Sequence, residues 1–461
     1  MKGLGFNRLS GKYSILRSTK RFPGIRMFPL SHRLRHFFLA FIALSFLAAC
    51  GGNDDDNSTT VRLLNATVGI GTLSLYTGDD KRTADVQADA VSGYVGFDGG
   101  TYDAKLKLSG SSSSLLTKSV SLVSGNHYTA VAWGRDDGVK LALLTDDEDD
   151  PTSGSAKIRV FNAASDAGSL DMYISDSSAS LDGLSANAAG TAAGALSSYA
   201  EVGKGTYRLR LTAASEKGDL RLDVASVTLN DQDRVTVVVE PTSGGVLVSA
   251  LLVVQQKNGI TVAKNTNARA RVVASVSSNG VASATIGSTT LSSSLTSPGV
   301  GSYVVIPAGS QTLLTQMNGA TISSATTTID AGADYTVLIY GNTSLAQMKL
   351  ISDDNRLPTN TSKGKIRLIP AAEGYDTLSL AVDSVSVANE VPTGTASTFT
   401  TVNSNSGNAL IEVTSALSST PLYTTAKSSG STGVSIDSQG VYTMFMLGGG
   451  STPRGILRKD R

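Results

Sequence analysis

The chain has 461 residues, which suits three or four domains of ordinary size better than a single one. Charged residues make up 17% and aromatic residues 6%, and glycine occurs 47 times, so the composition excludes a coiled coil and argues against an ordinary helical enzyme. Residues 1–49 hold nine of the 39 Lys and Arg and none of the 38 Asp and Glu, so the rest of the chain is acidic. We therefore expect no nucleic-acid partner, because such binding needs a basic surface.

The N-terminal segment has the features of a secretory signal peptide. Basic residues at Arg33 and Arg35 precede an uncharged apolar stretch over residues 37–49. At 13 residues this stretch is shorter than the roughly 20 that a transmembrane helix needs, which favours a cleaved signal over a retained anchor. The segment before Met27 is long for a signal, so both Met1 and Met27 stay open as the start of the protein.

The end of the apolar stretch, Leu47-Ala48-Ala49-Cys50-Gly51, resembles the bacterial lipobox. The resemblance implies cleavage between Ala49 and Cys50 and lipidation of Cys50, which is the only cysteine in the chain. Several acyl chains would hold the protein firmly on a membrane. By analogy with Gram-negative lipoproteins, the absence of Asp at position 51 favours the outer membrane and leaves its two faces open. An ordinary signal peptide with a nearby cysteine is the alternative.

Four segments of the chain open with a similar strand, which indicates an internal repeat. The second residue of each opening is an arginine, and these arginines are spaced 97, 112 and 96 residues apart. They are Arg62, Arg159, Arg271 and Arg367. A second segment with alternating apolar and polar residues follows each opening and predicts a half-buried strand. We interpret the arginines as structural residues that pair with a carboxylate and protect a sheet edge.

Two further motifs recur in each unit. A glycine-containing motif in the middle of the unit predicts a β-hairpin, because glycine adopts turn angles that other residues resist. It occurs at Tyr94–Tyr102, Tyr199–Tyr207 and Tyr303–Gly309, with a degenerate version from Phe399. Each unit then closes with a strand rich in β-branched and aromatic residues, at Tyr128–Val131, Val235–Val238, Tyr335–Leu338 and Tyr442–Phe445.

These patterns predict an all-β fold of four tandem β-sandwich domains after a lipoprotein signal peptide, with either an immunoglobulin-like or a transthyretin-like strand order. The predicted segments are a signal peptide over 1–49, a lipidated flexible tether over 50–60, and β-sandwich units over 61–151, 157–262, 268–358 and 365–461. Polar, proline-containing stretches between the units predict linkers, and hence separate domains arranged like beads on a string.

The second unit carries a resemblance to a bacterial family, the domain-of-unknown-function 4397 family. The resemblance lies in Arg159–Ala167 and in Leu170–Tyr173, and it extends more weakly over nearly everything after residue 60. The family has no established activity, so the resemblance implies repeated domains and no chemistry. At the position where the family often has histidine, this chain has Asn65, Asn162, Ala274 and Pro370, so any chemistry that relied on that histidine is absent.

Few residues in the chain suit catalysis. A nucleophilic triad needs a base, and the only histidine after residue 36 is His127, which we expect to be a solvent-facing turn residue. Carboxylates are numerous but do not occupy matched positions on strands, so no glycosidase pair can be named. No phosphate-binding loop occurs. We therefore expect a protein without enzymatic activity or cofactor.

One acidic run is a candidate metal site. Residues 146–150 cluster hard oxygen ligands at a domain junction, which makes Asp146, Asp147, Asp149 and Asp150 weak candidates for calcium binding. The run lacks the regular spacing of a calcium loop, and a solvated acidic segment is the alternative. Trp133 and the recurring tyrosines suit stacking on sugars, but packing in the core is the expected role.

Together these features predict a lipid-anchored cell-envelope protein whose units serve as a non-catalytic spacer and as a binding or adhesion surface. The expected partners are the membrane, through the lipid anchor, and a polysaccharide, peptidoglycan or surface protein, with the ligand unidentified. Two alternatives stay open. One is a carbohydrate-active enzyme or enzyme accessory that uses paired carboxylates, and the other is a purely structural envelope lipoprotein.

Overall fold

The computed structural model describes residues 58–135, 138–277, 280–425, 433–449 and 453–461. These residues form strands and loops without a helix, so the predicted all-β fold is confirmed. No helix in this part of the chain is long and apolar enough to cross a membrane. Ala49, Cys50 and the rest of the predicted signal peptide lie outside the described residues, as does most of the predicted tether.

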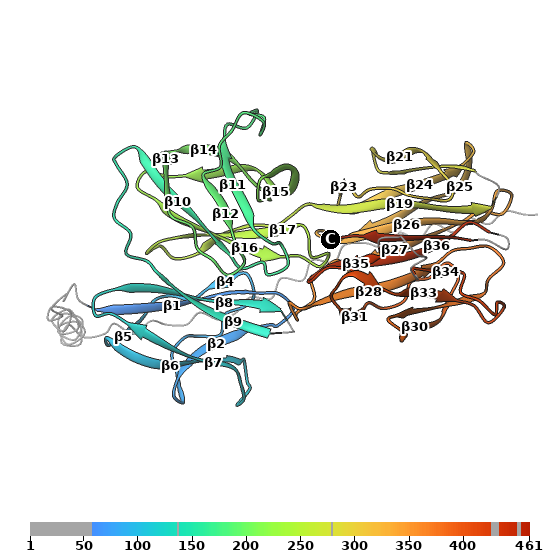
Figure 1. Ribbon diagram of the computed structural model, residues 1–461. Coiled ribbons are helices and arrows are strands. Elements are labelled where there is room, and N and C mark those ends of the chain that lie inside the picture. The colour runs from blue at the N-terminus through green and yellow to red at the C-terminus, as the bar shows by residue number, and fades with distance from the viewer. Residues whose placement is uncertain (1–57, 136–137, 278–279, 426–432, 450–452) are drawn as a thin grey trace, which may run out of the picture. The chain divides into compact units, whose positions relative to one another are not determined.

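One arrangement of two packed sheets recurs four times along the chain (Figure 1). We call each occurrence a repeat, its sheet with the first strand the opening sheet, and the other the second sheet. An apolar core lies between the two sheets of each repeat.

The strands of the first two repeats have matching orders. In the first repeat the opening sheet has the order β4-β1-β8-β9, with β5 also paired to β1, and the second sheet has the order β3-β2-β6-β7. The strands are β1 (Thr59–Thr67), β2 (Leu73–Thr77), β3 (Asp80–Lys81), β4 (Ala90–Val91), β5 (Val95–Phe97), β6 (Gly100–Leu108), β7 (Ser114–Leu122), β8 (His127–Arg135) and β9 (Gly138–Thr145). In the second repeat the orders are β13-β10-β16-β17-β18 and β12-β11-β14-β15. Its strands are β10 (Ser155–Asn162), β11 (Leu170–Ser175), β12 (Ala188–Thr191), β13 (Ala200–Gly203), β14 (Gly205–Ala213), β15 (Glu216–Leu229), β16 (Arg234–Pro241), β17 (Val248–Val254) and β18 (Ile260–Ala263).

The third and fourth repeats follow the same scheme. The third has the orders β22-β19-β26-β27, with β23 also paired to β19, and β21-β20-β24-β25. Its strands are β19 (Asn267–Ser277), β20 (Val281–Ile286), β21 (Thr289–Thr296), β22 (Gly299–Val300), β23 (Val304–Pro307), β24 (Gly309–Met317), β25 (Ala320–Ile329), β26 (Asp334–Asn342) and β27 (Gln347–Asp353). The fourth has the orders β31-β28-β36-β37 and β30-β29-β33-β34, with a further pair β32-β35. Its strands are β28 (Lys363–Pro370), β29 (Thr377–Val382), β30 (Val385–Pro392), β31 (Thr400–Asn403), β32 (Asn405–Ala409), β33 (Ile411–Thr414), β34 (Tyr423–Thr424), β35 (Val434–Ile436), β36 (Val441–Leu447) and β37 (Arg454–Lys459).

The first and the closing strand of each repeat pair in parallel at the centre of the opening sheet. These pairs are β1 with β8, β10 with β16, β19 with β26 and β28 with β36. A parallel pair needs a crossover connection, and here the strands of the second sheet provide it. The pairing brings together residues that are more than 60 positions apart in the sequence, such as Arg62 and Thr129, which are 67 apart.

The hairpin predicted in the middle of each unit is wrong. In the first repeat β5 pairs with β1 in the opening sheet, whereas β6 pairs with β2 and β7 in the second sheet. The second and third repeats divide the corresponding strands in the same way. The turn at Gly100, whose φ is +154°, therefore carries the chain from one sheet to the other instead of folding it back on itself.

The repeats are not independent like beads on a string, because neighbouring repeats share apolar clusters. One cluster combines Leu64 and Trp133 of the first repeat with Phe161 and Val238 of the second. Another cluster does the same for the third and fourth repeats, with Val273 from the third and residues such as Ile369 and Phe445 from the fourth. The opening sheets are thus buried on both faces, which gives them the continuous apolar runs typical of doubly covered strands.

The second and third repeats meet at a close backbone contact. The Thr242 hydroxyl and the Gly244 amide both donate to the carbonyl of Gly332, each at 2.9 Å. A Cβ atom on Gly332 would collide with Thr242, so this contact requires glycine. The segment Asn265–Asn267 between the second and third repeats is also held in place, since the buried Asn265 amide donates to the backbone carbonyls of Arg221 and Val248.

Candidate functional site

The four recurring arginines occupy equivalent places in the structure. Each lies on the first strand of its repeat, directly opposite a threonine of the closing strand, and its Nε donates to the threonine hydroxyl at 2.8 to 3.1 Å. Each guanidinium also lies 4.3 to 4.7 Å from the centre of an aromatic ring, a cation–π arrangement. The sets are Arg62, Thr129 and Tyr94; Arg159, Thr236 and Tyr199; Arg271, Thr336 and Tyr303; and Arg367, Thr443 and Phe399.

A carboxylate completes three of these sets. It lies 17 residues after the threonine, at Asp146, Asp353 and Asp460, and accepts the threonine hydroxyl. In the second repeat Gln255 follows β17 at the corresponding place. The predicted pairing of arginine with carboxylate is therefore confirmed for Arg62, Arg271 and Arg367, but the predicted place at a sheet edge is wrong. The arginines lie on inner strands and face the neighbouring repeat, where Arg62 is fully buried.

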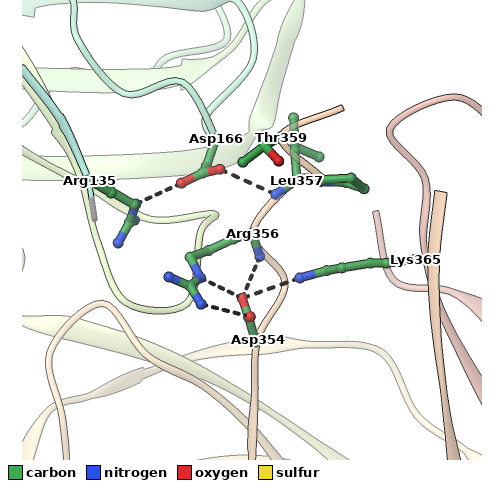
Figure 2. Close-up of a pocket in the computed structure, with 8 residues that line it drawn as sticks. Arg135, Asp166, Asp354, Arg356, Leu357, Thr359 and Lys365 are labelled. Atoms are coloured by element: carbon green, nitrogen blue, oxygen red, sulfur yellow. Dashed lines mark hydrogen bonds and ion pairs between the residues drawn. The ribbon is translucent and has the colours of Figure 1, made fainter. Parts of the chain in front are cut away.

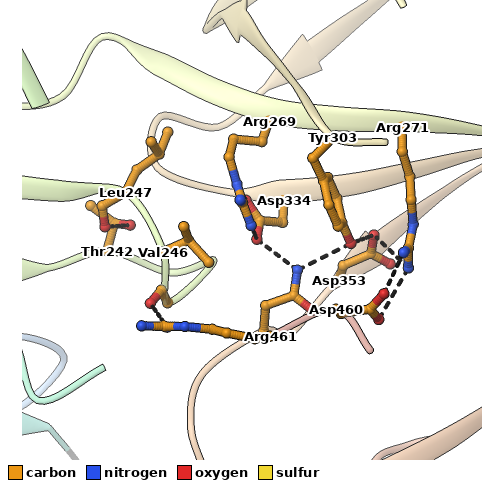
Figure 3. Close-up of polar contacts among 12 residues, drawn as sticks. Thr242, Val246, Leu247, Arg269, Arg271, Tyr303, Asp334, Asp353, Asp460 and Arg461 are labelled. Atoms are coloured by element: carbon orange, nitrogen blue, oxygen red, sulfur yellow. Dashed lines mark hydrogen bonds and ion pairs between the residues drawn. The ribbon is translucent and has the colours of Figure 1, made fainter. Parts of the chain in front are cut away.

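The third and fourth repeats exchange their ion pairs, and Figure 3 shows one of these contacts, Arg271 with Asp460. Arg271 of the third repeat donates to both oxygens of Asp460 in the fourth, and Arg367 of the fourth donates to Asp353 of the third at 2.5 Å. Burial by itself lowers the pKa of Arg271, but the charges of Tyr303, Asp460 and Asp353 outweigh it and the pKa is raised. Burial likewise opposes ionisation of Asp353, but Arg367 and Arg271 hold its pKa below the usual value.

The first and second repeats are joined by a related but unequal contact. Arg62 pairs with Asp146 of its own repeat at 3.3 Å and donates to the carbonyls of Lys257 and Val254 in the second repeat. Arg159 returns the contact by donating to the carbonyl of Thr145 at 3.0 Å. The arginines therefore act as interface residues in both pairs of repeats.

The candidate calcium ligands are distributed among these contacts. Asp146 is buried and accepts from Arg62, Thr129 and Tyr94. Asp150 pairs with Arg234. Among the described residues no group of three or more His, Cys, Asp or Glu is placed to hold a metal ion. The structure directs these carboxylates toward protein donors, and calcium binding there stays a prediction.

His127 does not lie in a turn, as predicted, but begins β8. Its Nδ1 lies 2.9 Å from a carboxylate oxygen of Asp147, which is the next candidate calcium ligand, and its ring meets Tyr94 edge to face. Asp149 contributes its backbone carbonyl, which accepts from Lys157. Asp147 therefore makes a contact within the first repeat, whereas Asp149 contacts the second repeat.

The asparagines at the position of the family's histidine are structural. The Asn65 amide donates to the carbonyls of Gly71 and Val86, and Asn162 makes the equivalent pair of bonds in the second repeat. Both asparagines are fully buried. Trp133 is buried between the first and second repeats, which confirms the core interpretation for this residue.

A charged cleft, which sequence reasoning missed, lies where the first two repeats meet the segment before β28 (Figure 2). Its main lobe has a volume of about 320 Å³ and contains Arg135, Arg356 and Lys365 with the carboxylates Asp166 and Asp354. Arg135 donates to Asp166 at 2.9 Å and Arg356 to Asp354 at 2.8 Å. The five residues come from three distant parts of the chain, so their spacing in the sequence gives no signal.

The protein environment shifts the pKa values of Asp354 and Lys365 in the main lobe for different reasons. Burial opposes ionisation of Asp354, but the bonds from Arg356 and the charge of Lys365 lower its pKa to about 2. Burial also lowers the pKa of Lys365, and Asp354 only partly offsets that effect. The Asp354 carboxyl group therefore stays ionised, whereas burial makes the charged form of Lys365 less favourable than it is in water.

The model of one protein family, the Domain of unknown function (DUF4397), matches the chain twice, over residues 59–173 and 268–381. Each match covers one repeat and ends in the second strand of the next, β11 or β29. No curated protein matches the chain. Both matches start in the first strand of a repeat, β1 or β19, so the family model begins where the structural repeat begins.

Three solved structures show weak similarity to this chain. The Bacillus anthracis TIE protein has 10% identity and a TM-score of 0.14 over 92% of this chain and 80% of that chain. The pneumococcal virulence factor SpuA, described as multi-modular and glycogen-degrading, has 9% identity and a TM-score of 0.16 over 78% and 36%. The Streptococcal ancillary pilin has 12% identity and a TM-score of 0.14 over 59% and 95%. At these scores the similarities carry no argument about function.

Proposed function

Because the chain carries repeated domains of the DUF4397 family, we propose that it is a lipid-anchored cell-envelope protein in which these domains form a non-catalytic spacer with a binding surface. The observation that carries the proposal is the reciprocal ion pairing of Arg271 with Asp460 and of Arg367 with Asp353. Contacts of this kind, together with the shared apolar clusters, hold neighbouring repeats in pairs. A spacer needs such stiffness to present a surface at a distance from its anchor.

The anchor is inferred from the sequence around Cys50. A basic segment, an apolar stretch and small residues precede the single cysteine, and a polar segment without apolar residues follows it. Lipidation there would leave the repeats joined to the outer membrane through a short tether, and a lipid with several acyl chains would make the attachment stable.

The binding surface is inferred from repetition. Similar domains in series offer several equivalent contacts, and linked contacts give useful avidity even when each is weak. A polysaccharide, peptidoglycan or a surface protein is the proposed partner. These polymers are themselves repetitive, so they match a repetitive protein.

The anchor is tested by metabolic labelling with an alkyne-bearing fatty acid, followed by membrane fractionation. We expect the wild-type chain to carry the label and to sediment with membranes, and the variant Cys50→Ser to lose both properties. Ser58→Ala, which changes a nearby tether residue, is the matched control and should behave like the wild type. Equal labelling of the Cys50→Ser variant would overturn the proposed anchor.

The location of the repeats is tested by treating intact cells with protease and following the fourth repeat with an antibody. Cleavage on intact cells would place the repeats outside and favour a matrix or surface partner. Protection until the outer membrane is permeabilised would place them in the periplasm and favour peptidoglycan. Recovery of the protein in the cytoplasm would contradict the proposed function.

A further inference from the structure

We propose that the charged cleft binds the carboxylate of an acidic sugar. The inference deepens the proposed function, on which it rests, by naming the ligand class of the binding surface.

The cleft has two lobes that share a wall. The main lobe of about 320 Å³ and a side lobe of about 380 Å³ are both lined by Asp166 and by the segment Leu357–Thr359. Each volume falls near the lower end of the range for small-molecule sites. Because the two lobes share these lining residues, they are adjacent, and a ligand with two chemically different ends can contact both.

The described lining residues of the two lobes carry more positive than negative charge. The cations are Arg135, Lys140, Arg356 and Lys365, and the carboxylates are Asp166 and Asp354. The chain after residue 49 carries the opposite excess, with 30 Lys and Arg against 38 Asp and Glu. A positive cleft in an acidic protein raises the local concentration of an anion.

Two of the three cations of the main lobe are largely removed from water, whereas the Arg356 side chain is 39% exposed. The side chains of Arg135 and Lys365 are 7% and 8% exposed. Figure 2 shows Lys365 pointing at Asp354 from the side opposite to Arg356. The Lys365 ammonium has three donors, and its distance to Asp354 is 3.3 Å, so it retains donors for a further oxygen. An anion beside it would also reverse the effect of burial on the pKa of Lys365.

The neutral polar groups of the side lobe indicate which chemical groups the ligand carries besides its carboxylate. Ser165, Thr359, Thr361 and Gln439 line this lobe and offer hydroxyl and amide groups that both donate and accept. Such groups match the hydroxyls of a sugar ring, which also donate and accept. The carboxylate of the ligand would pair with the Lys365 ammonium, because Arg135 and Arg356 already donate to Asp166 and Asp354. The two lobes together fit a sugar acid.

The experiment is isothermal titration of the full-length chain, solubilised in detergent, with D-glucuronate. D-Glucose is the neutral control ligand, and inorganic phosphate is the control for an anion without a sugar ring. We expect saturable binding of D-glucuronate and no measurable binding of D-glucose. Absence of D-glucuronate binding, or equal binding of both sugars, would overturn the proposal, and tighter binding of phosphate would overturn the sugar assignment.

Variants locate the site. Lys365→Met should weaken D-glucuronate binding about tenfold, because a charge-assisted bond to the ligand is lost. Lys363→Met removes the same charge from the same strand, outside the cleft, and should bind within about twofold of the wild type. Lys140→Met, at an exposed position of the side lobe, should weaken binding about threefold and serves if the Lys365 variant does not fold. Undiminished binding by both cleft variants would overturn the proposal.

The D-glucuronate titration and the lipidation test can fail independently of each other. A chain that is lipidated and membrane-bound but does not bind D-glucuronate refutes the ligand and leaves the spacer in place. A chain that binds D-glucuronate but is not lipidated refutes the anchor and leaves the cleft in place.

Discussion

Arg271 and Asp460 lie 189 residues apart in the sequence, yet the guanidinium donates to both oxygens of the carboxylate, with Nη2 3.2 Å from Oδ2. The two side chains are almost completely buried, at 2% and 0% exposed. A charge in such a place depends on its partner, because water does not replace a lost contact. The third repeat therefore depends on the last residues of the fourth for its own stability.

Asp460→Asn should destabilise the protein by about 3 kcal/mol, because it leaves the buried charge of Arg271 without its main partner. Asp437→Asn, which disturbs the half-exposed pair of Asp437 with Lys459, should change stability by less than about 1 kcal/mol. Chemical denaturation followed by circular dichroism measures both. Equal effects of the two variants would refute the role of the buried pair.

Phe161→Ala should loosen the contact between the first and second repeats at a cost of about 3 kcal/mol. Phe161 meets Trp133 edge to face, with ring centres 5.8 Å apart. Trp133 is the only tryptophan in the chain, so its fluorescence reports on this interface alone. We expect its emission to shift to longer wavelength in the native state of the variant. Phe97→Ala, in the core of the first repeat, should leave the native emission unchanged.

Glu240 should make the protein less stable as the pH rises from about 5 to 8. Burial, aided by the charge of Asp89 and opposed by Lys264, raises the pKa of Glu240 from 4.5 to about 7. The folded state therefore keeps a proton that the unfolded chain releases, so stability falls between these two values, by roughly 3 kcal/mol. Lys264 joins Glu240 to Asp89 of the first repeat, with its Nζ 3.1 Å and 2.7 Å from the two carboxylates.

Glu240→Gln removes this dependence, so its stability relative to the wild type should increase over the same pH range. Denaturant midpoints at pH 5, 6, 7 and 8 measure the difference. Glu390→Gln, at an exposed position, is the control for loss of one carboxyl group. A constant difference between Glu240→Gln and the wild type across the range would refute the prediction.

Tyr335→Phe and Tyr442→Phe should each destabilise the protein by about 1 kcal/mol. The hydroxyl of each tyrosine accepts the amide of a residue five positions earlier, at 3.1 Å from Asp330 and 2.9 Å from Asp437. Tyr207→Phe removes a hydrogen bond at an exposed site and should have a smaller effect. Thermal melting of the three variants compares them. The prediction fails if Tyr207→Phe is as destabilising as the other two.

Much of the arginine site was visible in the sequence, but as separate motifs. The first strand supplied Arg62, the middle motif supplied Tyr94 and the closing strand supplied Thr129. Nothing in the sequence indicated that they converge, because the parallel pairing of β1 with β8 joins residues 67 positions apart. Asp146 was a weak candidate for calcium binding, because the acidic run gives no sign of the buried partners Arg62, Thr129 and Tyr94.

One neglected signal was the pair of adjacent apolar residues in each first strand. Neighbouring residues of a strand point to opposite faces, so such a pair requires both faces to be covered. Leu63 indeed packs in the core of the first repeat and Leu64 in the cluster shared with the second. The same division holds for Val272 and Val273 in the third repeat. These pairs contradict a string of separate domains.

The sequence alone determined the all-β fold and the periodicity, because alternation of side chains along a strand and glycine at turns are local properties. The proposal of a lipid anchor at Cys50 likewise rests on the sequence alone. The tertiary structure alone decided the parallel pairing, the exchange of ion pairs between Arg271, Asp460 and their counterparts, and the charged cleft. Those features depend on which distant surfaces are buried together, and burial is what turns a common surface arginine into an interface residue.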